Sequence, residues 1–403
     1  MVSKETTNQG GVLGMKKMIP FFLILALLFA GCSADPTSQS VYQPPEKFDD
    51  GIDVGTLEEV NIDSNLIQNA VDKIRDGKYS EVHSILIFTD NKLVFEEYFA
   101  GHPYQWDGPG NHGAWVEWDR TMPHETMSDT KSITSASIGI AIDQGFIDSV
   151  DQSIFDYLPE YQYFNTGGKD KITIKHLLTM TSGLDWNEWG APYTDLNNDI
   201  FRLWVECENQ AVCTLERPLI AEPGTSFNYC GGGMVLLTEI IENATGMDIE
   251  TFSGQYLFEP LGIDPPVWAR FESGLIDGSN GINITPREMA KIGLTFLNDG
   301  VWDGEQIVSE QWVEKSAAAY AENSGIKVPG EGSGRVGYAY SWWTKQYSHS
   351  GQEINMFYAD GWGGQLIMVL PELNTVVVFT GGNYVTKNPV FKIFEKYILP
   401  AIK

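Results

Sequence analysis

The chain has 403 residues, 42% of them hydrophobic, which is enough apolar material for a large buried core. Its 54 acidic and 26 basic side chains give a formal net charge of −28. A surface this acidic repels phosphate groups and anionic lipids, so we expect no nucleic-acid partner, and no EF-hand loop pattern assigns the charge to calcium binding.

The N-terminus carries the pattern of an export signal. Lys16 and Lys17 precede the apolar run MIPFFLILALLFAG, which ends at Cys32 and is shorter than the roughly 20 residues that span a bilayer. The first fourteen residues resemble an upstream extension, so Met1 and Met15 are both candidate starts. The pair before Cys32 resembles a bacterial lipoprotein box, which implies cleavage there and a lipid on the Cys32 sulfur; cleavage by an ordinary signal peptidase is the alternative.

A tether is predicted after the signal. Residues 33–59 are polar and rich in proline and acids, which is typical of an extended linker, so the catalytic domain is expected to cover residues 60–403. The chain would then be extracytoplasmic and anchored to a membrane through its lipid.

Strand patterns occupy both ends of this domain. Residues 84–99 read as two β-rich runs around a turn at Asp90–Lys92, which predicts a hairpin. After residue 336 the runs GYAYSWWTK, INMFYAD, GQLIMVLP and TVVVFTGG follow, and the chain closes on an amphipathic helix.

Helical patterns fill the middle. The predicted helices cover residues 128–145, 174–184, 234–246 and a segment capped by Thr285. Short turns between the late strands favour antiparallel pairing. We therefore predict an α+β fold, with an antiparallel sheet flanked by helices (about 60–127 and 280–403), a mainly helical lobe (about 128–279), and a cleft between them.

Three cysteines remain after Cys32. Cys207 and Cys213 are close enough in sequence to close a small surface loop as a disulfide outside the cytoplasm, and two free thiols are the alternative. Cys230 is left without a partner.

Ser128 and Lys131 lie three positions apart at the start of a predicted helix. Residues at this spacing share a helix face, so the lysine can reach the serine hydroxyl and activate it as a nucleophile if its own pKa is lowered. The alternative is that Ser128 only caps the helix. A second copy of the spacing, Ser324 to Lys327, lies in a glycine- and proline-rich loop.

Other catalytic signatures are missing from the sequence. It contains no Gly-x-Ser-x-Gly, no His-Glu-x-x-His, no dinucleotide-binding glycine pattern and no P-loop. His176 is interpreted as a packed helix residue. We expect no metal and no organic cofactor.

Four ordered segments carry a family resemblance: TMSDTKSITSASIGIAIDQG, ITIKHLLTMTSGLDW, PGTSFNYCGGGMVLLTEIIENATG and GWGGQLIMVLPELNTVVVFTGG. Together they resemble the serine β-lactamase and penicillin-binding protein superfamily. The resemblance covers about residues 60–403 and is strongest to the class C-like branch, which includes esterases, D-aminopeptidases and 6-aminohexanoate-oligomer hydrolases. It implies a β-lactamase/transpeptidase-like fold.

The resemblance implies roles for particular residues. Ser128 matches the acylated serine, Lys131 its paired lysine, and Tyr229 the family tyrosine that shares proton transfer. A phenol beside an ammonium is expected to have a lowered pKa. The backbone N–H groups of Ser128 and Trp362 would form the oxyanion hole. Tyr163, a rival tyrosine, is out of order and is given a structural role.

Two positions depart from the family pattern. Gly231 stands where asparagine or serine is usual, and Ala359-Asp360-Gly361 stands where a lysine or histidine begins the last motif, so the cation that holds a β-lactam carboxylate is missing. Asp360 either faces a cationic or polar substrate group or is a solvent-facing acid, and Gly361 lets a substrate lie close to the strand.

Trp189 and Trp362 are expected as walls of the cleft, and Cys230 as a packed residue behind Tyr229.

The sequence therefore supports a serine hydrolase that cleaves an ester or amide bond through an acyl-enzyme on Ser128, with Gly231, Asp360, Gly361 and Trp189 at the substrate. A D-amino-acid peptidase or a β-lactamase is the alternative within the family. An inactive protein that binds cell-wall fragments is the alternative of another class.

Overall fold

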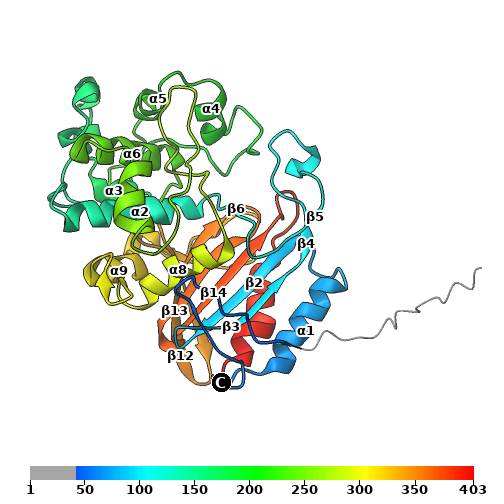
Figure 1. Cartoon of the computed structure of the whole chain (residues 1–403). Coiled ribbons are helices and arrows are strands. Elements are labelled where there is room, and N and C mark those ends of the chain that lie inside the picture. The colour runs from blue at the N-terminus through cyan, green and yellow to red at the C-terminus, as the bar shows by residue number, and fades with distance from the viewer. Residues whose placement is uncertain (1–41) are drawn as a thin grey trace, which may run out of the picture. The chain divides into compact units, whose positions relative to one another are not determined.

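The computed structural model describes residues 42–403 (Figure 1). Contacts divide the chain into two units, 1–40 and 41–403, and the second is described below. The predicted signal, the lipid attachment at Cys32 and the first part of the tether lie outside the described residues. No helix among residues 42–403 has both the length and the apolar character needed to cross a membrane.

One eight-stranded sheet forms the centre of the domain. Its strands run in the order β1-β3-β2-β14-β13-β12-β11-β10. They are β1 (Asp53–Val54), β2 (Val82–Thr89), β3 (Lys92–Tyr98), β10 (Gly337–Tyr338), β11 (Trp343–His349), β12 (Gln352–Gly361), β13 (Gln365–Leu370) and β14 (Thr375–Gly381). All neighbours pair antiparallel except the short β1 and β3, which confirms the predicted α+β fold with its antiparallel sheet.

The sheet joins the two ends of the domain. Strand β2 pairs with β14 along its whole length, and the hydroxyls of Ser84 and Thr380 lie 2.7 Å apart across this pair. Every residue of β2 is buried, because helices cover both faces of the sheet there. The strand patterns at the beginning and end of the sequence therefore belong to one core.

Alternation along β12 shows how the two faces are covered. The Phe357 ring packs against Phe296 on α8 (Pro286–Leu297), and its neighbour Tyr358 packs against Phe391 on α10 (Val390–Ile393). Successive residues of a strand point to opposite faces, so α8 and α10 cover opposite sides. Helix α1 (Ser64–Arg75) packs beside the C-terminal helical segment (Figure 1).

Helices dominate the region inserted between β6 and β7. The further helices of the chain are α2 (Asp129–Asp143), α3 (Ile174–Leu178), α4 (Asp199–Val205), α5 (Gln210–Glu216), α6 (Gly231–Thr245), α7 (Ile249–Ser253) and α9 (Glu310–Ala317). Short helical turns cover Pro109–Asn111, Ile154–Asp156, Pro159–Phe164, Lys169–Lys171, Gly254–Phe258, Ala321–Asn323, Pro371–Leu373, Phe394–Ile398 and Leu399–Ala401. Two-residue strands pair as β4 (Ala100–Gly101) with β5 (Val116–Glu117), β6 (His124–Glu125) with β7 (Asn283–Ile284), and β8 (Val301–Trp302) with β9 (Glu305–Gln306).

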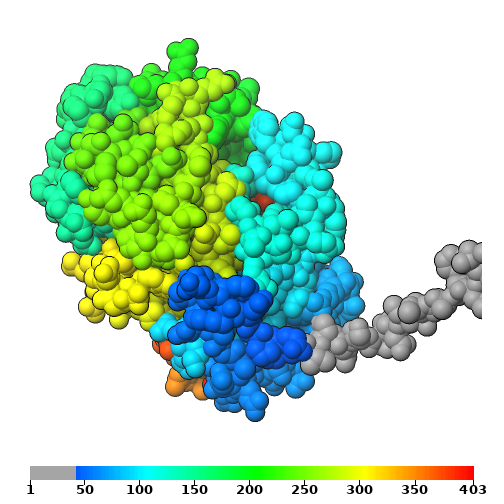
Figure 2. Space-filling model, in the orientation of Figure 1, coloured from blue at the N-terminus to red at the C-terminus, as the bar shows by residue number. Residues whose placement is uncertain are grey.

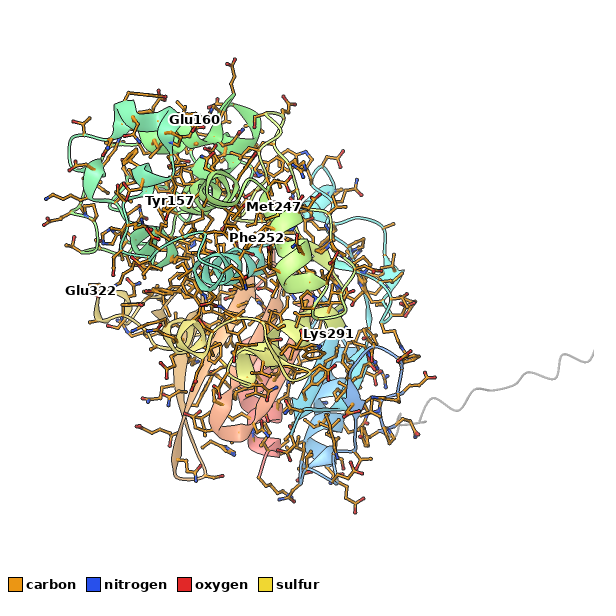
Figure 3. All side chains as sticks on the ribbon, turned by 60° about the vertical axis from the view of Figure 1, so that its left-hand side comes forward. Tyr157, Glu160, Met247, Phe252, Lys291 and Glu322 are labelled. Carbon is orange, nitrogen blue, oxygen red and sulfur yellow. A yellow bond between two sulfur atoms is a disulfide. The ribbon has the colours of Figure 1, made fainter. Side chains whose placement is uncertain are left out.

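Helix α2 connects the helical region to the sheet. It contacts α6 and α7 on one side and β12 and β13 on the other, and its residues 129–141 are all buried. In Figure 3, Tyr157, Met247 and Phe252 lie in the helical region, whereas Lys291 on α8 lies beside the sheet. A helix buried on all sides is held by its surroundings, so its first turn has a fixed position.

The predicted tether is too long. The Tyr42 hydroxyl donates to the Val94 carbonyl at 2.7 Å, and β1 within residues 53–54 extends the sheet. Arg287 on α8 reaches Asp50 at 2.7 Å. Figure 2 shows this dark blue segment packed on the domain. Buried apolar, partly buried aromatic and paired charged side chains hold residues 42–59, so within the described residues this stretch is part of the folded domain.

Helix α8 approaches the sheet through Gly293. A Cβ atom there would lie 2.7 Å from Ile367 Cγ2 and 2.8 Å from Val376 Cγ1. We expect Gly293→Ala to lower the free energy of unfolding by about 1–2 kcal/mol, because overpacking outweighs the gain of up to ~1 kcal/mol in helix propensity. The change in the free energy of unfolding is measured by urea denaturation of the native chain and the variant.

The matched control is Gly233→Ala on α6. The nearest side-chain atom to a Cβ there is Leu177 Cδ2 at 3.4 Å, an ordinary contact. This variant is expected to be as stable as the native chain or slightly more so. Equal effects of the two substitutions would contradict the close packing of α8 on the sheet.

Candidate active site

Ser128 stands at the N-cap of α2, yet its side chain does not cap the helix. Its Oγ instead accepts a hydrogen bond from Lys131 Nζ at 2.9 Å. The preceding residue, Met127, is buried and has a φ of 52°, a left-handed conformation that is rare outside glycine. Strained backbone of this kind gathers at functional sites, and here it leads directly into the serine.

Lys131 is buried with its amine among oxygen atoms. Nζ donates to the Ser279 carbonyl at 2.9 Å and lies 3.9 Å from Oε1 of Glu188, whose side chain is equally buried. Burial lowers the pKa of Lys131 from its usual value, and the negative charges of Glu188 and Asp277 oppose that shift. A lysine whose pKa is lowered can take a proton from a neighbouring hydroxyl.

Tyr229 comes from the segment before α6 and reaches the same serine. Its ring stacks between those of Trp189, at 5.1 Å, and Trp343, at 5.8 Å, and Lys131 Nζ lies 4.8 Å from the ring centre. Burial raises the pKa of Tyr229 well above its usual value, Glu188 raises it further, and a hydrogen bond with Ser128 lowers it.

The expected lowering of the Tyr229 pKa is therefore wrong. It took account of the Lys131 ammonium, but complete burial of the phenol and the nearby carboxylate of Glu188 have the larger effect. Tyr229 is thus held as a neutral phenol beside the serine.

Glu188 is the part of this site that sequence reasoning missed. Its Oε2 accepts hydrogen bonds from Trp186 Nε1 and from the Gly231 backbone N–H, both at 2.8 Å. The run DWNEW, in which an acid stands between two aromatic residues just after the second family segment, was the available signal.

The Gly231 backbone N–H donates to the Glu188 carboxylate, and Gly231 does not line the cavities described below. A Cβ atom on Gly231 would lie 2.7 Å from Ile200 Cδ1 and 3.0 Å from Glu188 Oε2. Among the described residues, Gly231 lines neither of the two cavities that open at Ser128. Glu188 occupies the space where a side chain at this position would project, and the contact of Gly231 with substrate stays a prediction.

Gly361 is likewise needed for packing. A Cβ atom there would lie 2.2 Å from the Thr126 carbonyl oxygen, so glycine lets the end of β12 approach the segment that leads to Ser128. Gly361 does not line either cavity at the serine in the part of the chain that is described. This close approach places Trp362 beside Ser128, and both residues line both cavities.

Two backbone donors are available beside the serine. Over residues 42–403, neither the Ser128 N–H nor the Trp362 N–H donates to a backbone or side-chain acceptor. Backbone N–H groups without a partner can stabilise negative charge that develops on an oxygen between them.

The smaller cavity, of about 440 Å³, is mainly apolar. Its walls include Trp106, Phe201, Trp204, Met127 and Ile200, and Ser128 and Lys131 open into it. In Figure 2 the surface is hollowed between the cyan segment that carries Trp106 and the yellow-green part of the helical region, with red atoms visible at depth.

The larger cavity, of about 1140 Å³, is lined by aromatic residues beside Ser128, namely Trp189, Trp343 and Tyr229. Charged residues of both signs also line it: Asp360, Glu331, Lys327 and Lys387. Burial raises the pKa of Glu331 to about 7, although a hydrogen bond from Asn388 opposes the shift. Burial also raises the pKa of Asp360, and Glu331 adds to that effect. Asp360 directly follows Ala359, the position where the resemblance implies a cation.

The remaining predicted residues lie outside the Ser128 cluster. Cys207 and Cys213 form a disulfide, and Cys230 is buried at the start of α6, where burial raises the pKa of its thiol. Tyr163 is 63% exposed and lines neither cavity at Ser128 in the described part of the chain. Ser324 is exposed and donates to the Ala321 carbonyl, although Lys327 lines the larger cavity.

His176 contributes to the N-terminus of α3. Its ring Nδ1 accepts from the Thr173 backbone N–H, and the Thr173 hydroxyl accepts from the His176 backbone N–H. This reciprocal pair is a capping box, so the interpretation of His176 as a structural helix residue is confirmed.

Known proteins resemble this chain in sequence and in fold. The 6-aminohexanoate-dimer hydrolase of Paenarthrobacter ureafaciens is 27% identical over 267 residues, which are 63% of this chain and 65% of that protein. The chain thus spans slightly less than two thirds of the length of that relative.

Two solved structures share the architecture at lower identity. A family VIII carboxylesterase superposes with a TM-score of 0.62 at 16% identity, covering 83% of this chain and 96% of the other. An octameric penicillin-binding protein homologue from Pyrococcus abyssi gives 0.58 at 20% identity, covering 82% and 76%. These likenesses show the β-lactamase-like fold.

A family model supplies the assignment itself. The model described as "Beta-lactamase" matches residues 68–383, which include the hairpin, the Ser128 segment, the helical region and all of the late strands. With its ordered motifs and its fold in agreement, the chain belongs to the beta-lactamase family.

Proposed function

We propose that the protein is a serine hydrolase that cleaves ester or amide bonds through an acyl-enzyme on Ser128. The observation that carries this proposal is the 2.9 Å contact between Ser128 Oγ and the buried amine of Lys131, whose pKa is lowered by burial. A serine hydroxyl becomes an effective nucleophile when a neighbouring base accepts its proton.

Lys131 is the base of the first step. In its neutral form it accepts the Ser128 proton as Oγ attacks the substrate carbonyl carbon, and the carbonyl oxygen becomes negatively charged. The N–H groups of Ser128 and Trp362 then donate to that oxygen. Removing one such donor from a serine hydrolase typically costs about 10²–10³ in kcat.

Tyr229 is the acid that releases the leaving group. Because its pKa is raised, the phenol carries its proton at neutral pH and can donate it to the departing alcohol or amine. The Lys131 ammonium, close to the Tyr229 ring, restores that proton. Water then attacks the acyl-enzyme and regenerates the Ser128 hydroxyl, so every proton returns to its starting group.

The two cavities suggest which substrates are accepted. The smaller cavity suits a mainly apolar group of moderate size, because aromatic and aliphatic side chains form most of its walls, although Glu125 and Glu188 also line it. The larger cavity suits a polar group, because Asp360, Glu331, Lys327 and Lys387 line it beside the aromatic residues. The names of the relatives, a carboxylesterase and an amide hydrolase, are consistent with both bond types.

The alternatives receive less support from this geometry. A β-lactam carboxylate would meet no lysine or histidine at Ala359, where the resemblance implies a cation, so antibiotic hydrolysis is disfavoured. A D-amino-acid peptidase would need a clamp for a substrate carboxylate, and Ala359 supplies no cation for one. An inactive binding protein would not require the close arrangement of Ser128, Lys131 and Tyr229.

We further propose that the enzyme acts outside the cytoplasm, held to a bacterial membrane by a lipid on Cys32. The support is the signal-like sequence before Cys32 and the disulfide between Cys207 and Cys213, a bond that persists in oxidising compartments. Metabolic labelling with a radioactive fatty acid, with Cys32→Ser as the comparison, tests the anchor.

A fluorophosphonate probe should label the native protein at Ser128. Ser128→Ala is expected to abolish labelling, because the attacking oxygen is gone, and to lower esterase turnover to the uncatalysed level. The matched control is Ser324→Ala, which removes the serine of the second Ser-x-x-Lys copy and should leave labelling intact. Persistent labelling of Ser128→Ala would refute the assignment.

Replacing Glu188 by glutamine should shift the pH dependence of kcat/KM. The Glu188 carboxylate raises the pKa of Lys131, so its removal lowers that pKa further and leaves the amine neutral at lower pH. The acid limb of the pH profile is therefore expected to move to lower pH. The glutamine side chain is close in shape to the native one, and its carbonyl can still accept from Trp186 and Gly231.

The direction of this shift decides the role of Lys131. A limb that stays in place, or moves to higher pH, would show that a different group limits the rate on the acid side. Circular dichroism and thermal unfolding of the Glu188→Gln variant provide the check that its fold is retained.

The size of the smaller cavity should set the preferred acyl chain. Each buried methylene contributes about 0.8 kcal/mol, so kcat/KM for p-nitrophenyl esters is expected to rise with chain length until the cavity is full. Phe201→Ala enlarges the cavity and should move the optimum to longer chains. Tyr163→Ala, an exposed aromatic, is the control and should leave the optimum unchanged.

A further inference from the structure

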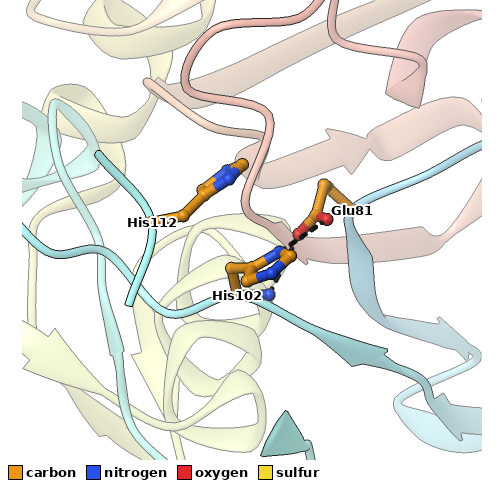
Figure 4. A group of neighbouring side chains, drawn as sticks. All are labelled: Glu81, His102 and His112. Carbon is orange, nitrogen blue, oxygen red and sulfur yellow. Dashed lines mark hydrogen bonds and ion pairs between the residues drawn. The ribbon is translucent and has the colours of Figure 1, made fainter. Parts of the chain in front are cut away.

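Four of the six histidines in the sequence form a cluster with Glu81 at the start of β2. Glu81 precedes that strand, His83 lies within it, and His102, His112 and His124 come from the following segments. Figure 4 shows Glu81, His102 and His112 converging from separate parts of the backbone. None of these residues takes part in the chemistry proposed at Ser128.

We propose that Glu81, His102 and His112 bind a divalent transition-metal ion, with Zn²⁺ as the expected occupant. One ligand atom from each of the three lies within 4.8 Å of the others, and His102 Nδ1 is 2.9 Å from Glu81 Oε1. Two imidazoles and one carboxylate are a common zinc donor set, and imidazole also suits copper and nickel.

The ligands are oriented by contacts from the backbone. His112 Nε2 donates to the Gly382 carbonyl at 2.7 Å, and the His102 backbone N–H donates to Glu81 Oε2 at 3.0 Å. Outer hydrogen bonds of this kind fix ring orientation and carboxylate position in metal sites.

A fully buried histidine extends the cluster. His83 Nε2 has no hydrogen-bond partner among the described residues and lies 3.6 Å from Glu81 Oε2. Two glycines leave room for it: a Cβ atom on Gly101 would lie 2.4 Å from His83 Nε2, and one on Gly382 would lie 2.9 Å from it. Gly101 and Gly382 thus leave space for the His83 ring, whose Nε2 faces the Glu81 carboxylate.

Binding requires one ring to turn. The His102 and His112 rings are nearly parallel, with centroids 4.6 Å apart and an interplanar angle of 10°. A nitrogen lone pair lies in the plane of its ring, so two parallel rings cannot both point at one ion. The His102 side chain is 31% exposed and has room to rotate about its Cβ–Cγ bond, after which the ion replaces its direct contact with Glu81.

The ion would fix one wall of both cavities. His102 and His112 lie at the two ends of a segment that carries Tyr104 and Trp106, which line the smaller cavity. The Gly382 carbonyl belongs to the stretch that continues into Asn383 and Tyr384 beside the larger cavity. An ion at Glu81 would join these two segments to the beginning of β2 and so act as a structural site.

The test is metal content and affinity. Purified protein is stripped with a chelator, reloaded with Zn²⁺, desalted and measured by inductively coupled plasma mass spectrometry. We expect one zinc per chain in the native protein, and loss of stoichiometric zinc in His102→Gln and in His112→Gln. Losing a direct ligand should weaken binding by more than the roughly 10–100-fold cost of losing an outer partner.

His349→Gln is the matched control, because His349 bonds to the Ile402 carbonyl near the C-terminus and should not affect zinc binding. A Co²⁺ titration of the native protein, read by its visible absorption bands, keeps the proposal testable if a variant fails to fold. Absence of bound metal in the native protein, or equal zinc in all four proteins, would overturn the proposal.

Discussion

The buried amine of Lys131 is the contact on which the site depends. An amine that is removed from water must find polar partners, and Lys131 finds them in Ser128, Ser279 and Glu188, which come from three separate segments. Helix α2 is buried along residues 129–141 between the sheet and the helical region, so the serine cannot move without its lysine. The same burial that holds the amine in place also lowers its pKa, which joins the stability of the core to the chemistry proposed for it.

The departures from the family pattern alter one side of the cleft. Asp360 lies near the end of β12 and lines the larger cavity together with Glu331, and the carboxylate of Glu188 occupies the space beside Gly231. The serine, lysine and tyrosine thus stand where the resemblance implies them, whereas Gly231 and Ala359 depart from it. Folds that carry many functions typically differ in the residues around the reacting groups.

The secondary-structure elements and the residue spacing that depend on local sequence patterns could be predicted from the sequence. The β2–β3 hairpin, the capped helix α8 and the Ser128–Lys131 spacing follow from alternation, from the Thr285 capping box and from helix geometry. The position of Glu188 beside Lys131 could not be predicted, because it depends on the folding of the loop that carries it. The Tyr229 pKa depends on burial, which one sequence does not give, and the histidines around Glu81 are separated by strands and turns whose packing brings them together. Residues 42–59 were predicted to be a linker but are folded, because a polar composition does not exclude a strand or an ion pair on the domain.

The pairing of β2 with β14 has a consequence for how the chain reaches its native state. The hydroxyls of Ser84 and Thr380, which meet across this pair, are 296 positions apart in the sequence. Contacts of such long range are slow to form, since a long loop must close before they contribute any stability. The middle of the sheet is therefore completed by its last strand, and a ribosome must release nearly the whole polypeptide before the core can close. Until then the β2–β3 hairpin has an apolar edge without its neighbour, so this protein should depend on chaperones that shield such edges during synthesis.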